Sequence, residues 1–257
     1  MTLTFYKYQG TGNDFVMLDN RNLLFPKEDV KLVSFLCDRR FGIGADGLIL
    51  LEDDATHDFK MVYYNSDGNP STMCGNGGRC LVAFAQQLGI ITDSASFSAV
   101  DGLHTATIEN DIVSLQMNNV LEVFEKPNSF FLDTGSPHHV QLVKNLKDLD
   151  VDAEGGKLRY GLYGAAGSNI NFVEQSSPNA FAVRTYERGV EGETLSCGTG
   201  VTAVALAMHH SNKTTSNEVT IHAEGGDLSV RFDYNEGYKD VHLVGPAKFV
   251  FKGEIEC

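Results

Sequence analysis

The chain has 257 residues, of which 42% are hydrophobic and 21% charged, as in an ordinary globular protein of one large or two small domains. Its formal net charge of −14 argues against nucleic-acid and anionic-membrane partners, although a local positive site could still hold a small anionic substrate. No apolar run approaches the roughly 18 residues of a membrane helix, and the first residues lack a signal-peptide pattern, so we expect a cytoplasmic protein.

Short alternating or β-branched runs predict strands along most of the chain. Helices are expected over residues 30–39, 78–88 and 200–210, the last two directly after glycine-rich turns. The predicted strands are Leu3–Tyr8, Phe15–Asp19, Gly47–Leu51, Phe59–Tyr64, Ile112–Met117, Val140–Val143, Asn171–Glu174, Ala180–Tyr186, Val219–His222 and Leu228–Phe232.

The sequence repeats itself, with Cys197 lying 123 positions after Cys74. Glycines recur in turns by chance, but several matches in one ungapped register indicate a duplication. The matched pairs are Gly12 and Gly135, Gly44 and Gly167, Tyr63 and Tyr186, and Cys74 and Cys197.

This duplication predicts an α+β fold of two pseudo-symmetric domains, each a curled, mostly antiparallel, barrel-like sheet around a central helix. The boundary is expected near 120–127, where charged residues and Pro127 interrupt the apolar pattern. The first half would cover residues 1–119, completed by a last strand at about 247–257, and the second half residues 120–246.

The cysteines differ in their surroundings. Their odd number argues against a disulfide framework, and without a C-x-x-C pair we expect no metal site. Cys37 and Cys80 lie among apolar neighbours and are expected in the core, and Cys257 is terminal. Cys74 and Cys197 each precede a glycine-rich turn that enters a predicted helix.

A helix start offers backbone N–H groups and the positive end of the helix dipole, which bind a carboxylate and stabilise a thiolate. A single buried cysteine before a helix is usually a packing residue. Two cysteines related by a repeat suit the inversion of a carbon acid. That reaction needs a base on one face of the carbon and an acid on the other. No lysine has a context typical of a pyridoxal Schiff base, so we predict a reaction without a cofactor.

Several motifs in order resemble the diaminopimelate epimerase family, from Phe5 to about Gly253. They are Gly10–Phe15, Gly42–Gly47, Asn65–Gly68, Met73–Arg79, Gly135–His138, Asn169, Tyr186–Gly189 and Cys197–Gly200. The resemblance implies interconversion of LL- and meso-2,6-diaminopimelate, in lysine and cell-wall precursor biosynthesis. Proline and hydroxyproline racemases or epimerases, which usually carry a histidine at the Asn76 position, are the alternative.

The resemblance also implies roles for individual residues. Cys74 and Cys197 would be the catalytic acid/base pair, with His138 and Glu187 tuning their pKa values. The substrate-binding residues implied are Asn13, Asn65, Gly75, Asn76, Asn169, Glu187, Arg188, Gly198 and Thr199. Gly47 and Ser136 stand where many family members have a substrate-contacting glutamine and an asparagine, so these two positions can offer only backbone and a single hydroxyl.

The residues alone allow other interpretations. Asn13 and Asn65 could be turn residues, Glu187 and Arg188 a surface pair, and His138 a strand residue without a ligand. The protein could also be a non-enzyme, either a redox dithiol protein or a small-ligand binding module. Against the first of these, the two cysteines of a redox pair would be expected in a C-x-x-C motif. We expect a small-molecule amino-acid substrate as the partner, with a homodimer compatible with the sequence.

Overall fold

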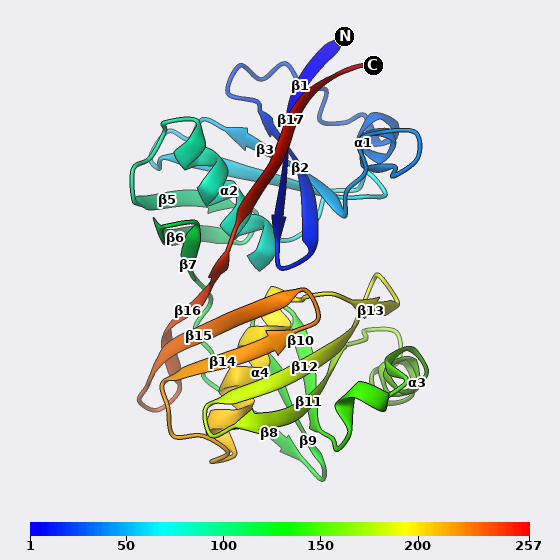
Figure 1. Ribbon diagram of the computed structural model, residues 1–257, viewed down its shortest axis with the longest axis vertical. Coiled ribbons are helices and arrows are strands. Elements are labelled where there is room, and N and C mark those ends of the chain that lie inside the picture. The colour runs from blue at the N-terminus through cyan, green and yellow to red at the C-terminus, as the bar shows by residue number, and fades with distance from the viewer. The chain divides into compact units, whose positions relative to one another are not determined.

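The computed structural model describes residues 1–257, which divide into two compact units (Figure 1). The first unit comprises Met1–Leu115 and Pro246–Cys257, and the second Gln116–Gly245. The first unit holds the helices α1 (Val30–Cys37) and α2 (Gly75–Gln87) and the strands β1 (Thr2–Gly10), β2 (Asn13–Asp19), β3 (Gly47–Glu52), β4 (Phe59–Asn65), β5 (Ser94–Ala99), β6 (Gly102–Glu109), β7 (Ile112–Gln116, ending at the boundary) and β17 (Lys248–Glu256).

The second unit has the same mixture of a helix and surrounding strands. Its helices are α3 (Val151–Tyr163), α4 (Gly198–His210) and a 3-10 turn, η1 (Leu146–Asp148). Its strands are β8 (Phe124–Lys126), β9 (Ser129–Asp133), β10 (Pro137–Leu142), β11 (Asn169–Ser177), β12 (Ala180–Glu187), β13 (Gly192–Thr194), β14 (Glu218–Ala223), β15 (Gly226–Tyr234) and β16 (Tyr238–Pro246).

In the first unit, a tight hairpin joins β1 to β2. Gly10 pairs with Asn13, and the two residues between them have positive φ, 51° at Thr11 and 83° at Gly12. Two consecutive positive φ values define a type I′ turn, whose twist matches that of the flanking strands. β17 pairs antiparallel with the other edge of β1, so the two chain ends lie side by side in this unit (Figure 1).

The helix α2 is the core of the first unit. It packs against β1, β2, β3, β6 and β17, and every residue from Gly75 to Ala85 is buried. A helix that is buried all round lies within a domain rather than on its surface. Its Phe84 ring lies 4.8 Å from the ring of Tyr6. The helix is thereby fixed against the strands, and so is its first residue, where the candidate site begins.

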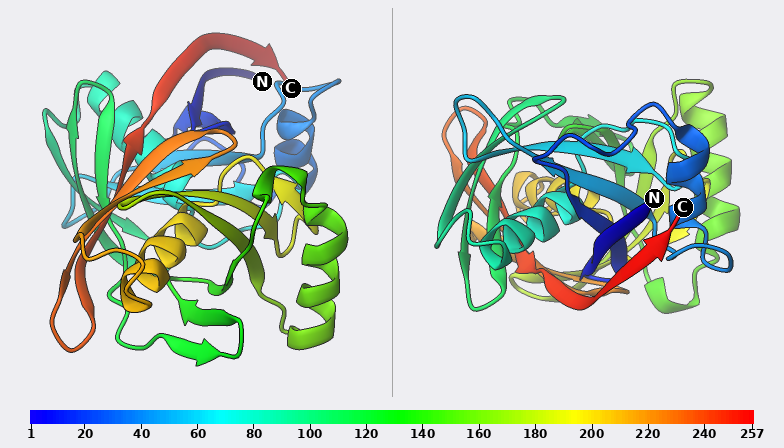
Figure 2. Two further views of the ribbon diagram at one scale, coloured as in Figure 1. Left: turned by 60° about the horizontal axis from the view of Figure 1, so that its bottom comes forward. Right: turned by 90° about the horizontal axis from the view of Figure 1, so that it is seen from above.

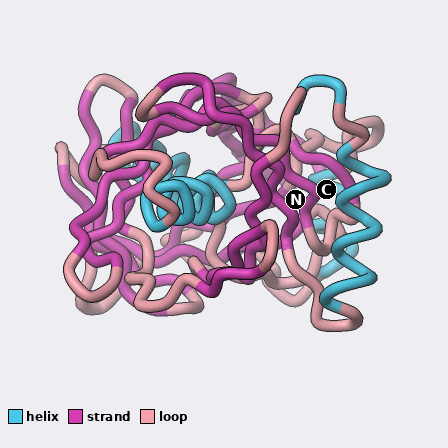
Figure 3. The backbone as a smooth tube through the Cα atoms, turned by 90° about the horizontal axis from the view of Figure 1, so that it is seen from below, coloured by secondary structure: helices cyan, strands magenta, loops and turns pink.

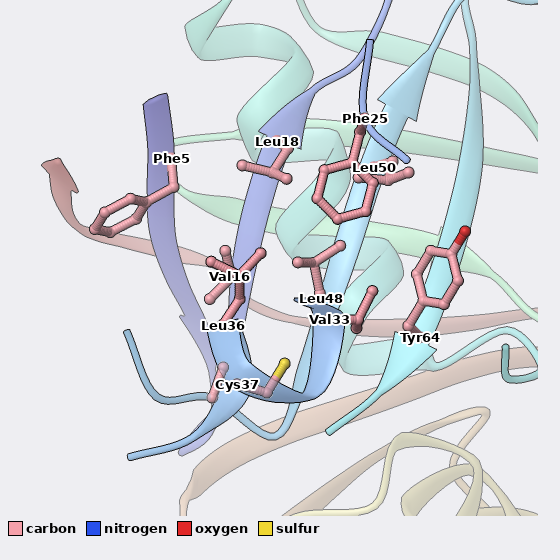
Figure 4. Close-up of a cluster of buried hydrophobic side chains, with 11 residues drawn as sticks. Phe5, Val16, Leu18, Phe25, Val33, Leu36, Cys37, Leu48, Leu50 and Tyr64 are labelled. Atoms are coloured by element: carbon pink, nitrogen blue, oxygen red, sulfur yellow. The ribbon is translucent and has the colours of Figure 1, made fainter. Parts of the chain in front are cut away.

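A second apolar layer covers the opposite face of the strands (Figure 4). There α1 places Val33, Leu36 and Cys37 against side chains from β1 to β4, including Val16 and Leu48. Burial raises the pKa of Cys37 to about 12. The prediction that Cys37 is a core residue is therefore confirmed.

In the second unit, strands are arranged around α4 (Figure 3). The helix packs against β9, β10, β11, β12, β14 and β15. The helix α3 runs apart from α4 (Figure 2) and shares a small core with Ile170, Phe172 and Tyr186. Because side chains alternate along a strand, Asn169 and Asn171 of β11 point to the face opposite Ile170 and Phe172.

These observations confirm the α+β prediction, with sheets that are curled rather than closed. Each of the ten strands predicted from alternating or β-branched runs overlaps an observed strand and extends past it by at most one residue, and β17 (Lys248–Glu256) lies where a last strand was expected. The central helices begin earlier than predicted, at Gly75 and Gly198, because each glycine-rich turn is itself helical. The first helix ends at Cys37 rather than Arg39, since Asp38 is extended and its carboxylate accepts the next backbone N–H groups.

The helix α3 was not predicted from the sequence, because its three glycines lower its helix propensity. Asp150 begins this helix by accepting a hydrogen bond from the backbone N–H of Ala153 at 3.0 Å. Six strands were also not predicted from the sequence: β5, β6, β8, β9, β13 and β16. No helix is long and apolar enough to cross a membrane.

Candidate active site

The two repeated cysteines occupy equivalent positions at the starts of two helices. Cys74 precedes α2 with φ −111° and ψ 122°, and Cys197 precedes α4 with φ −119° and ψ 110°. The carbonyl of Cys74 accepts the first helical hydrogen bond, from Gly78 at 2.7 Å, and that of Cys197 accepts from Val201 at 2.8 Å. Each helix has 13 residues, so each unit presents a cysteine and a set of N-terminal N–H groups in the same local geometry.

In the first unit, Asn13 contacts both Cys74 and the helix start. The thiol of Cys74 donates to Oδ1 of Asn13 at 3.7 Å, and Nδ2 of Asn76 donates to the same oxygen at 3.3 Å. The amide nitrogen of Asn13 donates to Oδ2 of Asp46 at 2.7 Å. A carboxylate only accepts hydrogen bonds, so this contact determines which end of the Asn13 amide faces the thiol.

A group of charges behind Asn13 holds Asp46 in place. Arg39 donates to Asp46 at 2.7 Å and to Asp14 at 2.7 Å, and Lys7 forms a 2.8 Å ion pair with Asp14. Burial raises the pKa of Asp14, but the hydrogen bonds and charges of Arg39 and Lys7 outweigh this effect and hold it at about 2. Asp14 is therefore ionised at neutral pH.

Gly47 and Asn65 face each other across the pair β3 and β4. A Cβ atom at Gly47 would lie 2.6 Å from Cε2 of Tyr63 and 2.6 Å from the carbonyl oxygen of Tyr64. A larger side chain at position 47 would therefore meet Tyr63 and the backbone of Tyr64, so this position offers only its backbone. Asn65 is exposed and closes a turn, its backbone N–H donating to Asn69 at 3.0 Å.

Arg79 is a charged residue of α2 for which the sequence predicted no individual role. It is fully buried, and Nη2 donates to Oγ1 of Thr11 at 3.4 Å, whereas Nε and Nη1 make no hydrogen bond. Burial lowers its pKa to about 10, against the opposing influence of the Cys80 and Cys74 thiols. Cys80 is buried too, which raises its pKa to about 12 and confirms its prediction as a core residue.

In the second unit, a chain of polar side chains leads from His138 to Cys197. Nε2 of His138 lies 2.9 Å from Oγ1 of Thr199, which lies 3.5 Å from Sγ of Cys197. His138 is fully buried, and this burial, together with the charge of Arg188, lowers its pKa to about 3. The ring is therefore neutral at physiological pH.

A second group of candidates meets around Asn169. Its Nδ2 donates to Oγ of Ser136 at 3.0 Å, and its Oδ1 accepts from the backbone N–H of Arg188 at 2.9 Å. The guanidinium of Arg188 donates to the carbonyl of Ala166 at 3.0 Å and to Oγ of Ser136 at 3.5 Å. The hydroxyl of Ser136 thus accepts hydrogen bonds from both Asn169 and Arg188. The carboxylate of Glu187 accepts from Oγ1 of Thr194 at 3.0 Å.

The structure thus brings most of the expected residues together within their own units. The first unit joins Asn13, Cys74, Gly75 and Asn76, and the second joins Ser136, His138, Asn169, Arg188, Cys197, Gly198 and Thr199. Gly47 and Asn65 lie together on β3 and β4 of the first unit, and Glu187 lies at the end of β12 in the second. Asp46 and Asn171 were not predicted as site residues. Asn171 carried a signal, because Asn169 and Asn171 alternate with the apolar residues Ile170 and Phe172 at the start of β11.

The family model described as diaminopimelate epimerase matches residues 5–121 and 130–250, which include both helix starts. The chain belongs to the diaminopimelate epimerase family. A diaminopimelate epimerase from Flavobacterium psychrophilum is 64% identical over 253 residues, covering 97% of this chain and 99% of that protein. The diaminopimelate epimerase from Chlorobaculum tepidum is 43% identical over 256 residues, covering 96% and 98%. This membership makes the chain an isomerase.

Solved structures with low sequence identity share the fold of this diaminopimelate epimerase family member. A phenazine biosynthesis protein of the PhzF family from Bacillus anthracis aligns over 100% of both chains, with a TM-score of 0.80 and 13% identity. A hydroxyproline epimerase from Agrobacterium vitis aligns over 99% of this chain and 92% of its own, with a TM-score of 0.74 and 14% identity.

Proposed function

We propose that this chain interconverts LL- and meso-2,6-diaminopimelate in the cytoplasm, on the route to lysine and cell-wall precursors. The observation that carries the proposal is the repeated helix start, with Cys74 before α2 and Cys197 before α4. The names of relatives, one of which is 64% identical, support the choice of substrate.

In the proposed mechanism, the two cysteines act on opposite faces of one α-carbon. One cysteine, as a thiolate, takes the α-proton, so the C–H bond breaks and an S–H bond forms. The electron pair spreads from the α-carbon into the adjacent carboxylate. The other cysteine gives its thiol proton to the opposite face of the same carbon and becomes the thiolate. The product has the inverted configuration, and the two thiols have exchanged roles.

The helix starts supply the positive potential that this chemistry requires. Backbone N–H groups of Gly75 and Asn76, and of Gly198 and Thr199, would bind the α-carboxylate and the charge that develops on it. No cofactor takes part in the proposed reaction. Because removal of an α-proton leaves a carbanion, this stabilisation is the main contribution expected from the protein.

The distal end of the substrate would be held by the second group of candidates. Arg188 offers a fixed positive charge for a second carboxylate, and Asn65, Asn169, Ser136 and Glu187 offer partners for the remaining polar groups. Proline and hydroxyproline lack that second carboxylate. Arg188 is therefore the residue that favours diaminopimelate over the alternative substrates of this fold.

A substrate panel tests this proposal directly. The protein would be incubated with LL-diaminopimelate, meso-diaminopimelate, L-proline and trans-4-hydroxy-L-proline, and the products separated by chiral chromatography. We expect LL- and meso-diaminopimelate to approach the same mixture from either side, with both prolines unchanged. Inversion of a proline, with diaminopimelate unchanged, would contradict the proposal.

A further inference from the structure

Asn171 lies beneath the first turn of α4, at the centre of the polar chain in the second unit. It is fully buried, and a Cβ atom on Gly200 would lie 2.5 Å from its Oδ1. Nδ2 of Asn171 donates to the carbonyl of His139 at 2.9 Å, and Oδ1 accepts from Oγ1 of Thr185 at 3.0 Å. A carbonyl can only accept, so these contacts determine which end of the amide is the nitrogen.

This orientation determines the tautomer of His138. Nδ2 of Asn171 lies 3.1 Å from Nδ1 of His138, and an amide NH₂ group can only donate. Nδ1 must therefore accept, which places the hydrogen of the neutral ring on Nε2. The buried position of His138 and the charge of Arg188 both disfavour a second proton on the ring.

The hydrogen on Nε2 has one well-placed acceptor. Oγ1 of Thr199 lies 2.9 Å from Nε2. Asn169 also approaches Nε2, but at 3.5 Å, and its Nδ2 has nearer acceptors in Ser136 at 3.0 Å and the carbonyl of Pro137 at 3.2 Å. The Nε2–H group therefore donates to Thr199.

Thr199 passes this orientation on to Cys197. The Thr199 hydroxyl accepts a hydrogen bond from His138. The hydroxyl's own hydrogen is therefore directed toward Sγ of Cys197, which lies 3.5 Å from Oγ1. The carbonyl of Thr199 accepts from Oγ1 of Thr134 at 2.8 Å, which holds the residue in place. A sulfur that accepts a hydrogen bond is stabilised in its thiolate form.

We propose that Asn171 is a positioning residue for Cys197: it holds His138 as the neutral Nε2–H tautomer, and so directs the Thr199 hydroxyl hydrogen to the Cys197 sulfur. The proposal deepens the proposed function, on which the need for a Cys197 thiolate rests. The charged and titratable groups around this row of hydrogen-bonded side chains are Arg188, which acts on His138, and the neighbouring His139, whose pKa is lowered by its own burial. Neither adds a proton to these hydrogen-bonded side chains at neutral pH.

Two readouts without substrate test the proposal, so its failure is distinct from failure of the proposed function. The first is the tautomer of His138, from ¹⁵N-histidine NMR of the ring nitrogens, assigned with a His138→Gln variant. We expect the Nε2–H form between pH 5 and 8 in the unaltered protein. A predominant Nδ1–H form, or a doubly protonated ring in this range, would overturn the proposal.

The second readout is the pH at which iodoacetamide alkylation of Cys197 is half-maximal, followed by peptide mass spectrometry. The midpoint reports thiolate formation independently of how exposed the thiol is. In Asn171→Leu we expect a mixture of His138 tautomers and an alkylation midpoint for Cys197 about one pH unit higher. At a pH below both midpoints this shift corresponds to alkylation about tenfold slower. In Thr199→Val we expect the same rise in midpoint with the tautomer unchanged.

Thr185→Val is the matched control, because it removes one hydrogen bond to the same buried amide. It leaves the carbonyl of His139, which by itself fixes the position of the amide nitrogen, and the contact to His138. It should keep both the tautomer and the midpoint of the unaltered protein, and Cys74 should keep its own midpoint in every variant. Equal shifts in Thr185→Val and Asn171→Leu would show a general packing effect, and unchanged values in Asn171→Leu would show no relay. Either result would overturn the proposal.

Discussion

Nδ2 of Asn13 lies 2.7 Å from Oδ2 of Asp46, and this contact turns the amide oxygen of Asn13 toward Sγ of Cys74. Without the carboxylate, the amide could rotate and present its NH₂ group to the thiol instead. We expect Asp46→Ala to lower kcat/KM about tenfold, the effect of about 1.4 kcal/mol from one charge-assisted hydrogen bond.

Steady-state kinetics with diaminopimelate would measure this change, with Asp19→Ala as the control. Asp19 is also paired with an arginine, Arg21 at 2.7 Å, but has no contact with Asn13. The control should keep nearly full activity. Equal kcat/KM values for the two variants would show that Asp46 does not position Asn13.

Arg188 tests the assignment of the distal carboxylate. Replacement by Leu should leave that carboxylate without its charged partner. We expect kcat/KM to fall by the factor that corresponds to a loss of about 2–4 kcal/mol in transition-state stabilisation. Arg231→Leu, which removes an exposed arginine of β15, is the matched control and should behave normally. Near-normal turnover by the Arg188→Leu variant would show that the distal site lies elsewhere.

Asp14 predicts how the first unit responds to acid. Its pKa of about 2 in the folded protein lies below the value of about 3.9 in an unfolded chain. The unfolded state therefore takes up this proton first, so the stabilisation is complete above about pH 4 and is lost as the pH falls toward 2. Asp14→Asn should be less stable at pH 6 and should show a flatter dependence of the unfolding free energy between pH 4 and 2. Denaturant unfolding at several pH values would measure this, and an unchanged slope would contradict the assignment.

Oxidation tests whether the two cysteines serve one carbon. If both flank the same α-carbon, their sulfurs can approach one another once the substrate has left. We expect mild oxidant to inactivate the protein through a Cys74–Cys197 disulfide, with activity restored by dithiothreitol. Cys257→Ser, which removes the exposed terminal thiol, should be inactivated equally. Inactivated protein in which mass spectrometry finds both Cys74 and Cys197 still reduced would contradict the facing arrangement.

Much of the fold follows from local patterns in the sequence. Strand alternation and the apolar runs after Cys74 and Cys197 located ten strands and both central helices, because those signals come from neighbouring residues. The helix α3 was missed for a tertiary reason. A Cβ atom on its Gly155 would lie 2.4 Å from Tyr186, so this glycine permits close packing while it weakens the helical signal.

The site was only partly predictable for a similar reason. Cys74 and Cys197 could be found because each is followed directly in the sequence by a glycine-rich turn. Asp46 and Asn171 act through Asn13 and His138, which lie 33 residues away along the chain in each case, so only the folded structure shows the contact.

In the proposed mechanism two thiols act from opposite faces of the α-carbon, and the incorporation of solvent deuterium tests this arrangement most directly. Changing Cys74 or Cys197 to Ala removes one acid/base group and should abolish inversion, while circular dichroism shows an unchanged fold. That result alone would not distinguish a two-base from a one-base reaction.

In D₂O, thiol protons exchange with solvent, so the group that reprotonates the substrate carries deuterium. We expect the epimer formed in the first turnovers to carry deuterium at the inverted carbon, while the unreacted starting epimer remains largely protiated. ¹H NMR and mass spectrometry of the separated epimers would measure both. Protium retained at the inverted carbon of the product, or efficient epimerisation by a Cys74→Ala or Cys197→Ala variant, would contradict the two-thiol mechanism.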